Sequence, residues 1–176
     1  DLKTKEEKLL KKIHCHYSLE GHLLQQDHYD AHDQLRYSLY WEYDAHGNTT
    51  REVNAVGAEI TRTYDDNDNL IRERGPRPGD CKKYEYDYAN RLIRMTTKAD
   101  DKRWSVYYKY DWMGNRISET DRYGNETEYE YDDFNRLSRT TYPIISENSP
   151  RPQTEIHYDS LDRPIREINA RGFVTN

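Results

Sequence analysis

The sequence predicts an all-β protein made of tandem antiparallel β-hairpins that form one curved, spiralling sheet. Three observations support this fold class. The pair Tyr-Asp recurs along the chain, aromatic and charged residues alternate before most of these pairs, and a residue suited to a tight turn follows each pair at a fixed distance. Alternation with a period of two residues is typical of strands with one ring-bearing face and one charged face.

The composition is unusually polar, but it does not indicate a disordered chain. The 176 residues have a mean hydropathy of −1.28, and Leu, Ile, Val and Phe make up about one sixth of them. Such values are typical of disorder. However, the net charge is only −6, and the chain contains 17 Tyr and 3 Trp. We therefore expect aromatic rings with polar tips to supply the packing area.

The sequence excludes several classes of protein. No apolar stretch approaches the ~18 residues that span a membrane, and no signal-peptide pattern is present. Charges of both signs are interspersed, so the sequence shows no basic surface for nucleic acid. Cys15 and Cys81 lie far apart in the sequence. They do not form a disulfide framework. They therefore do not indicate whether the compartment is oxidising or reducing.

The Tyr-Asp pairs divide the chain into repeats, typically 21 to 24 residues long. The pairs begin at Tyr29, Tyr43, Tyr64, Tyr86, Tyr110, Tyr131 and Tyr158. The fourth residue after each Tyr is Asp33, Gly47, Asp68, Asn90, Gly114, Asn135 or Asp162. These residue types tolerate a left-handed backbone conformation, so each position predicts a turn. A second β-type run follows, which makes each unit a hairpin.

The repeated Asp suits this turn, because its carboxylate can accept hydrogen bonds from backbone N–H groups two residues on. The structural signature of the repeat consists of Tyr43, Asp44, Gly47, Tyr64, Asp65, Tyr86, Asp87, Asn90, Tyr110, Asp111, Gly114, Tyr131, Asp132, Asn135, Tyr158 and Asp159. Seven or eight hairpins predict about fourteen to sixteen strands, and sheets with more than ~10 strands usually curl or close. We expect the repeated tyrosines to form a ladder along one face.

A return turn connects one hairpin to the next. Short return turns are expected at 54–57, 121–124 and 169–172, while insertions at 74–80, 98–102 and 143–153 are expected to form exposed loops. In the first two short turns, a Tyr-Asp pair follows ten residues after the opening Asn or Asp. The third therefore predicts a pair near position 179, past the last residue. We infer a fragment of a longer repeat array.

This pattern gives three segments. Residues 1–16 form an N-terminal lead-in, either a short amphipathic helix or an extended segment. Residues 17–28 are a degenerate first repeat, which keeps Tyr17 and Gly21 but lacks the Asp. Residues 29–176 are the array of seven units, of which the last is truncated.

No catalytic residue, cofactor site or metal site is predicted. The repeated Asp residues could suggest catalytic carboxylates, but a catalytic pair should be unique, so a turn role is favoured. The sequence also lacks G-x-S-x-G, Walker and G-x-G-x-x-G motifs. His14, Cys15, His16 and His22 could suggest a zinc site, yet no second Cys pair completes a known spacing. On a strand, His14 and His16 would share one face while Cys15 points away.

Two histidines and the tyrosine rows have a structural alternative as well. His32 and His46 stand at the same repeat position, three residues after the Tyr, and are interpreted as turn residues. Rows of Tyr can bind sugars or peptides by stacking, but a regularly repeated Tyr favours a packing role. The sequence therefore identifies no binding residues.

The unit resembles the RHS/YD repeat. The two clearest copies are Tyr110 to Ile117 and Tyr131 to Leu137, and Tyr123 to Tyr131 is similar to the second half of the motif. The resemblance covers roughly residues 29–176 and, more weakly, 17–28. In this family the repeats form a β-sheet strip that spirals into a hollow shell. Bacterial members enclose a C-terminal toxic domain, and animal teneurins carry a related shell and act in adhesion.

The resemblance implies a non-enzymatic shell segment that encapsulates and helps deliver a C-terminal toxic effector. Its expected partners are the remainder of the shell and the enclosed effector, and its expected location is secreted or on the bacterial cell surface, within a larger exported protein. The alternative is an extracellular recognition surface for a glycan or a partner protein, although the three insertions contain no Tyr. A sugar-processing enzyme is the weakest alternative. Through its open sheet edges, an isolated chain should self-associate or be marginally stable.

Overall fold

The structure, a computed structural model, describes residues 12–146 and 149–176, where every regular element is a β-strand. The strands are β1 (Lys12–Tyr17), β2 (Leu23–Tyr29), β3 (Leu35–Tyr43), β4 (Thr49–Val53), β5 (Glu59–Tyr64), β6 (Leu70–Arg74), β7 (Cys81–Tyr86), β8 (Leu92–Ala99), β9 (Lys102–Tyr110), β10 (Arg116–Thr120), β11 (Glu126–Tyr131), β12 (Leu137–Thr141), β13 (Gln153–Tyr158), β14 (Pro164–Ile168) and β15 (Val174–Thr175). Fifteen strands confirm the predicted fold class and strand number.

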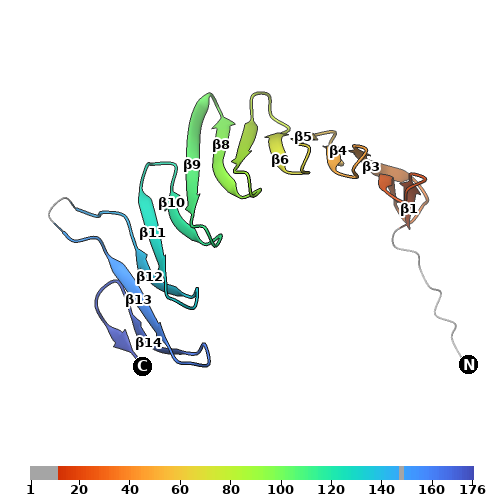
Figure 1. The fold of residues 1–176 in the computed structure, drawn as a ribbon. Helices are drawn as coiled ribbons and strands as arrows, with labels where there is room; N and C mark the ends of the chain where they lie inside the picture. Colours follow the sequence, from red (N-terminus) through yellow and green to blue (C-terminus); the bar gives the residue numbers. More distant parts are fainter. Residues whose placement is uncertain (1–11, 147–148) are drawn as a thin grey trace, which may run out of the picture. The chain divides into compact units, whose positions relative to one another are not determined.

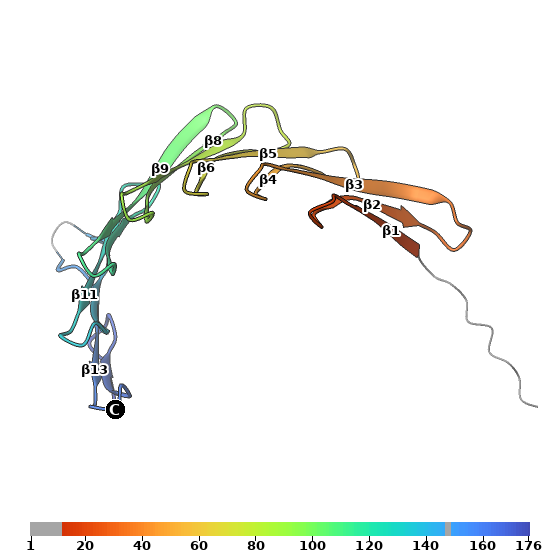
Figure 2. The same cartoon turned by 45° about the vertical axis from the view of Figure 1, so that its right-hand side comes forward.

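The strands are hydrogen-bonded in sequence order, from β1 to β15, in one antiparallel sheet that does not close. Backbone contacts divide the chain into two compact units. The first contains the residues up to 83 together with 98–101, and the second contains 84–97 and 102–176. Within each unit, turns join successive strands at alternating edges (Figure 1). Figure 2 shows β1, β2 and β3 of the first unit side by side from a second direction.

The two faces of the sheet differ as the alternation predicts. In the second unit, Tyr129 pairs across strands with Thr140, while Glu130 on the opposite face pairs with Arg139. The Arg139 guanidinium lies 2.9 Å from the Glu130 carboxylate and 3.1 Å from that of Glu155. Here one face carries a ring and the other carries charges that are paired across strands. In the first unit, by contrast, Arg62 shares the face of Tyr64 on β5 and pairs with Glu52 and Glu73.

The sheet has no aliphatic core in the part of the chain that the structure describes. None of the hydrophobic side chains there is fully buried, and the six buried residues are polar: Asp27, His28, Thr96, Ser118, Thr140 and Thr141. Half-buried rings and hydrogen bonds consequently carry the packing. Within the same residues there is no helix long and apolar enough to cross a membrane.

Two segments differ in part from what the sequence predicts. Lys12 to His16, the last part of the lead-in, belongs to β1, whereas the helix alternative over 1–11 lies outside the described residues. The segment 98–102 is no insertion loop. β8 continues to Ala99, and the hairpin closes through Asp100 and Asp101, whose φ values are 46° and 61°. Two consecutive left-handed residues form the tight turn that matches the twist of paired strands.

Candidate functional site: the tyrosine–aspartate turn row

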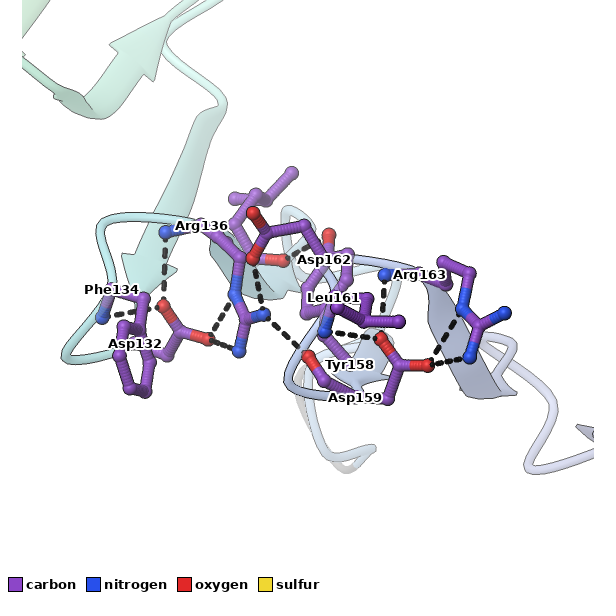
Figure 3. A network of polar contacts seen from close by, with 9 residues as sticks. Asp132, Phe134, Arg136, Tyr158, Asp159, Leu161, Asp162 and Arg163 are labelled. Carbon is purple, nitrogen blue, oxygen red and sulfur yellow. Dashed lines mark hydrogen bonds and ion pairs between the residues drawn. The ribbon is translucent and has the colours of Figure 1, made fainter.

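Each Tyr-Asp pair opens the same five-residue turn, which is seen clearly at Asp132 (Figure 3). The Asp132 carboxylate accepts hydrogen bonds of 3.0 Å from the backbone N–H groups of Phe134 and Arg136, and its other oxygen accepts from Arg136 Nε at 2.8 Å. The backbone N–H of Asn135 donates to the Asp132 carbonyl at 2.9 Å. The Asp thus satisfies donors that a tight turn would otherwise leave unpaired.

The turn recurs at every Tyr-Asp pair. The carboxylates that accept two backbone N–H groups in this way are Asp30, Asp44, Asp65, Asp87, Asp111, Asp132 and Asp159. The fourth residue after each Tyr has a positive φ, between 60° and 96°. This confirms the left-handed turn position predicted from the Gly, Asn and Asp pattern.

The return turns are built in the same way, a point that sequence reasoning missed. Asn54, Asp121 and Asn169 accept from the backbone N–H groups two and four residues on, and Gly57, Gly124 and Gly172 have positive φ. The shared pattern of Asn or Asp followed three residues later by Gly was visible in the sequence. The short return turns at these three places therefore use the same turn type as the Tyr-Asp turns at the other edge.

The repeat tyrosines connect each hairpin to the one before it. The Tyr64 hydroxyl donates to the Thr49 carbonyl at 3.0 Å, so the ring at the end of β5 reaches the first residue of β4. The same bond joins Tyr43 to Leu23, Tyr110 to Leu92, Tyr131 to Arg116 and Tyr158 to Leu137, each at 3.0 Å. The ladder predicted for these tyrosines is thus a series of hydroxyl-to-carbonyl links.

The fifth residue after the Tyr forms a second link between neighbouring hairpins, which the sequence does not predict. Arg136 donates to the Asp159 carbonyl at 3.0 Å and to the Asp162 carboxylate at 2.8 Å in the next turn (Figure 3). Its guanidinium also lies 4.6 Å from the centre of the Tyr158 ring, a cation–π distance. Arg91 makes the equivalent contacts with Asp111 and Tyr110. In the first unit, Asn48 donates to Asp68 at 2.7 Å.

The structure corrects the place of Tyr29-Asp30 in the array. In the first unit, the turns at 43–48 and 64–69 lie at one edge, whereas the turn at 30–34 joins β2 to β3 at the other. Cross-strand pairing also puts Tyr29 on the face of Lys12, opposite the Tyr43 ring. Tyr43 accordingly bonds to Leu23 of the hairpin that begins with Tyr17. Tyr17, not Tyr29, occupies the first position of the row.

The histidine and cysteine residues near the N-terminal end do not form a common site. As predicted, His14 and His16 share a face and Cys15 lies on the other, because their cross-strand partners are Asp27, Gln25 and Gln26. In residues 12–146 and 149–176, no three His, Cys, Asp or Glu side chains are placed to hold a metal ion.

His22, His46 and the two cysteines each have a local setting of their own. His22 lies in the first turn, with its ring centre 4.7 Å from that of Tyr43. His46 lies at a turn tip and is 2.8 Å from Asp68. Cys15 and Cys81 are free thiols.

Hydrogen bonds in the turns lower the pKa of the turn carboxyl groups. For Asp132, the largest cause of the lowered pKa is the hydrogen bond from the Arg136 side chain. For Asp159, it is the hydrogen bond from the Arg163 backbone N–H. For Asp121, the largest cause of the lowered pKa is the side-chain amide of Asn125. A carboxyl group whose pKa is lower in the folded state stabilises the fold when it is ionised.

We therefore expect the chain to lose stability as the pH falls below about 4, the pKa of an unfolded Asp. The stabilisation is complete above that unfolded pKa and disappears as the pH falls through the lower folded pKa. Urea denaturation followed by circular dichroism across this range measures the effect. A variant with Asp65→Asn and Asp121→Asn keeps the turns, as Asn54 and Asn169 do, and should show a flatter acid dependence. An identical pH profile in that variant would contradict the assignment.

The fold and its row of Tyr-Asp turns define an all-β protein built from hairpin repeats. Its similarity to known proteins identifies the kind of repeat. Residues 43–78 match the family described as RHS Repeat. Teneurin-3 of Danio rerio is 30% identical over 105 residues, which are 57% of this chain and 4% of that protein. Teneurin-4 of Homo sapiens is 31% identical over an alignment of the same length and the same coverage of both chains.

A bacterial relative matches as well. Probable deoxyribonuclease RhsB of Dickeya dadantii is 34% identical over 90 residues, which are 51% of this chain and 6% of that protein. The chain thus spans only a small part of its relatives, and residues 43–78 carry the RHS repeat. Among solved structures, that of TcdB2-TccC3-TEV aligns with 96% of this chain and 12% of its own, with 16% identity and a TM-score of 0.43.

Proposed function

We propose that this chain is a section of a curved RHS-repeat wall that encapsulates a C-terminal toxic effector and helps to deliver it. The repeat-to-repeat linkage is the observation that carries the proposal. Tyrosine hydroxyls bond hairpins to the preceding hairpin in both units, and Asn48, Arg91 and Arg136 bond hairpins to the following one. No hydrophobic side chain is buried among the described residues. Such a strip extends in one direction by adding hairpins, as a wall does.

The name of one bacterial relative supports this role. RhsB is named a probable deoxyribonuclease, and 6% of its length aligns with this chain. We infer that the wall itself is non-enzymatic, binds no cofactor, and has the rest of the shell and the enclosed effector as partners. Export within a larger bacterial protein follows from the same proposal.

Limited proteolysis of the full-length protein that contains this chain tests encapsulation. The effector region should resist protease until the shell is denatured. Tyr64→Ala combined with Tyr131→Ala in the same protein should open the wall and expose the effector, whereas Tyr29→Phe should not. Equal digestion of the effector with and without an intact wall, or a full-length protein with no effector region, would refute the proposal.

The teneurin matches favour a second candidate, a recognition surface for a glycan or a partner protein. The side chains of Tyr88 and Trp112 are 96% and 90% exposed at turn tips, where a ligand could stack on them. A glycan array probed with the chain should then give binding that is lost with Trp112→Ala. A blank array would remove the glycan form of this candidate.

A further inference from the structure

A cavity in the first unit lies between the turn that follows Tyr17 and the turn that follows Tyr43. Its volume is about 400 Å³. The residues that line it are Ser18, Glu20, His22, Leu24, Tyr43, Asp44 and Ala45. Sites for small ligands typically measure about 300–1,000 Å³. The space therefore suffices for a small ligand or for one side chain of a partner.

His22 stands where some later turns of the row have an arginine. It is the fifth residue after its repeat tyrosine, as Arg136 is. The His22 ring centre lies 4.7 Å from that of Tyr43 in the next turn. The Arg136 guanidinium lies at almost the same distance, 4.6 Å, from the centre of the Tyr158 ring. The surroundings of the cavity can therefore be compared directly with those later turns.

The later turns contain an ion pair that the first turn lacks. The Arg136 guanidinium lies 2.7 Å from the Asp132 carboxylate (Figure 3). The equivalent pair, with the same distance, is formed by Asp87 and Arg91. In the first turn these two positions hold Ser18 and His22. Serine and histidine are smaller than the aspartate and arginine that they replace, which accounts for the space between the two turns.

The first turn pair also keeps an acceptor that arginine uses elsewhere. The Asp159 carbonyl accepts from the backbone N–H of Asp162 at 3.3 Å and from Arg136 at 3.0 Å. Among the described residues, the corresponding Asp44 carbonyl accepts only from the Gly47 N–H, at 3.1 Å. Because a carbonyl oxygen has two lone pairs, the Asp44 carbonyl can accept a second hydrogen bond.

The lining of the cavity is acidic. Glu20 is exposed at its rim, and a hydrogen bond from Ser18 lowers the pKa of the Glu20 carboxyl group, so this group is ionised at neutral pH. Within the described part of the chain, no Lys or Arg lines the cavity. Hydrogen bonds between a cationic donor and a carboxylate are among the strong ones in proteins. The cavity therefore suits a cation that carries several N–H donors.

We propose that this cavity binds the guanidinium group of an arginine side chain from a partner polypeptide. The guanidinium donates to the Glu20 carboxylate and to the Asp44 carbonyl, the two kinds of acceptor that Arg136 bonds to in its own turns. A planar guanidinium with five donors can reach both acceptors at once, whereas an ammonium is a compact point charge. The partner thus supplies a group that later hairpins supply themselves. The proposal does not depend on encapsulation of an effector.

Titration of the chain with N-acetyl-L-arginine methylamide, followed by nuclear magnetic resonance, tests the site. Backbone amide signals of residues 18–24 and 43–47 should shift, with a dissociation constant on the order of 1 mM for a ligand of this size. The citrulline derivative has nearly the same shape but no charge and should bind about tenfold more weakly or less. The lysine derivative should also bind more weakly. Absence of shifts, shifts spread over the whole chain, or equal binding of either control compound would overturn the proposal.

Two variants connect the binding to the cavity. Glu20→Gln should weaken binding of the arginine derivative by about tenfold, because it removes the ionised acceptor. Ser18→Asp combined with His22→Arg restores the aspartate–arginine pair of the later turns, so the chain's own guanidinium should fill the cavity and abolish binding. Asp66→Asn is the matched control, because Asp66 is an exposed acid in a turn of the same unit but does not line the cavity. Circular dichroism verifies folding. Undiminished binding in either folded cavity variant, or an equal loss in the control, would refute the proposal.

Discussion

Replacing Tyr64 by alanine is expected to lower the free energy of unfolding by about 2–3 kcal/mol, less than for a fully buried ring because the residue is half-buried. The substitution removes a ring from a sheet that has no buried aliphatic side chains among its described residues. It also removes the hydroxyl that donates to the Thr49 carbonyl. Burial raises the pKa of this phenol, in agreement with a ring that is partly withdrawn from water. Urea denaturation followed by circular dichroism measures the change.

Two further variants separate the ring from the hydroxyl. Tyr64→Phe keeps the ring and should cost about 1 kcal/mol, the net contribution of one hydrogen bond. Tyr29→Phe should cost less, because the Tyr29 ring lies on the other face and at the other edge, although the same Tyr-Asp pair is present. Equal losses for the two Phe variants would show that the hydroxyl-to-carbonyl link contributes nothing specific.

Gly57→Val is expected to destabilise the chain by about 1–2 kcal/mol through the backbone alone, because a residue with a Cβ pays this cost in the left-handed region. Gly57 has a φ of +78°, and no atom lies within 4 Å of the position that a Cβ would take. Steric overlap with neighbours is therefore not the cause. Thermal or urea unfolding of the variant measures the loss.

Gly57→Asn is the matched control for this prediction. Asn135 already adopts a φ of 65° at the equivalent place in its own turn, so an Asn should cost much less than a Val. If Val and Asn lowered stability equally, the loss would have to come from the side chain's surroundings, and the conformational argument would fail.

The strands and the Tyr-Asp turns could be predicted because their causes are local. Alternation sets which face each side chain occupies, and the left-handed position selects Gly, Asn or Asp. The misplacement of Tyr29 has a cause as well. An interval of 14 residues to Tyr43 is too short for the two strands and two turns that separate neighbours in the row. The interval between Tyr-Asp pairs, and not the dipeptide alone, therefore identifies the members of the row.

The links between hairpins could not be predicted in the same way. The reach of Arg136 into the next turn depends on how far apart neighbouring hairpins lie, which the sequence does not state. The tight turn at Asp100 and Asp101 does not follow from the sequence, because neither residue is Gly. Asp in the left-handed region is permitted but less common, so composition alone favoured a loop.

The nearest-neighbour bonding of the hairpins has an evolutionary consequence. Tyr64 reaches only the preceding hairpin, and Arg136 reaches only the following one. A duplication that adds two strands with their two turns recreates the same bonds at both new junctions, and a deletion of the same length restores them. Genes for such chains can therefore lengthen or shorten by whole hairpins without redesign of the residues that remain.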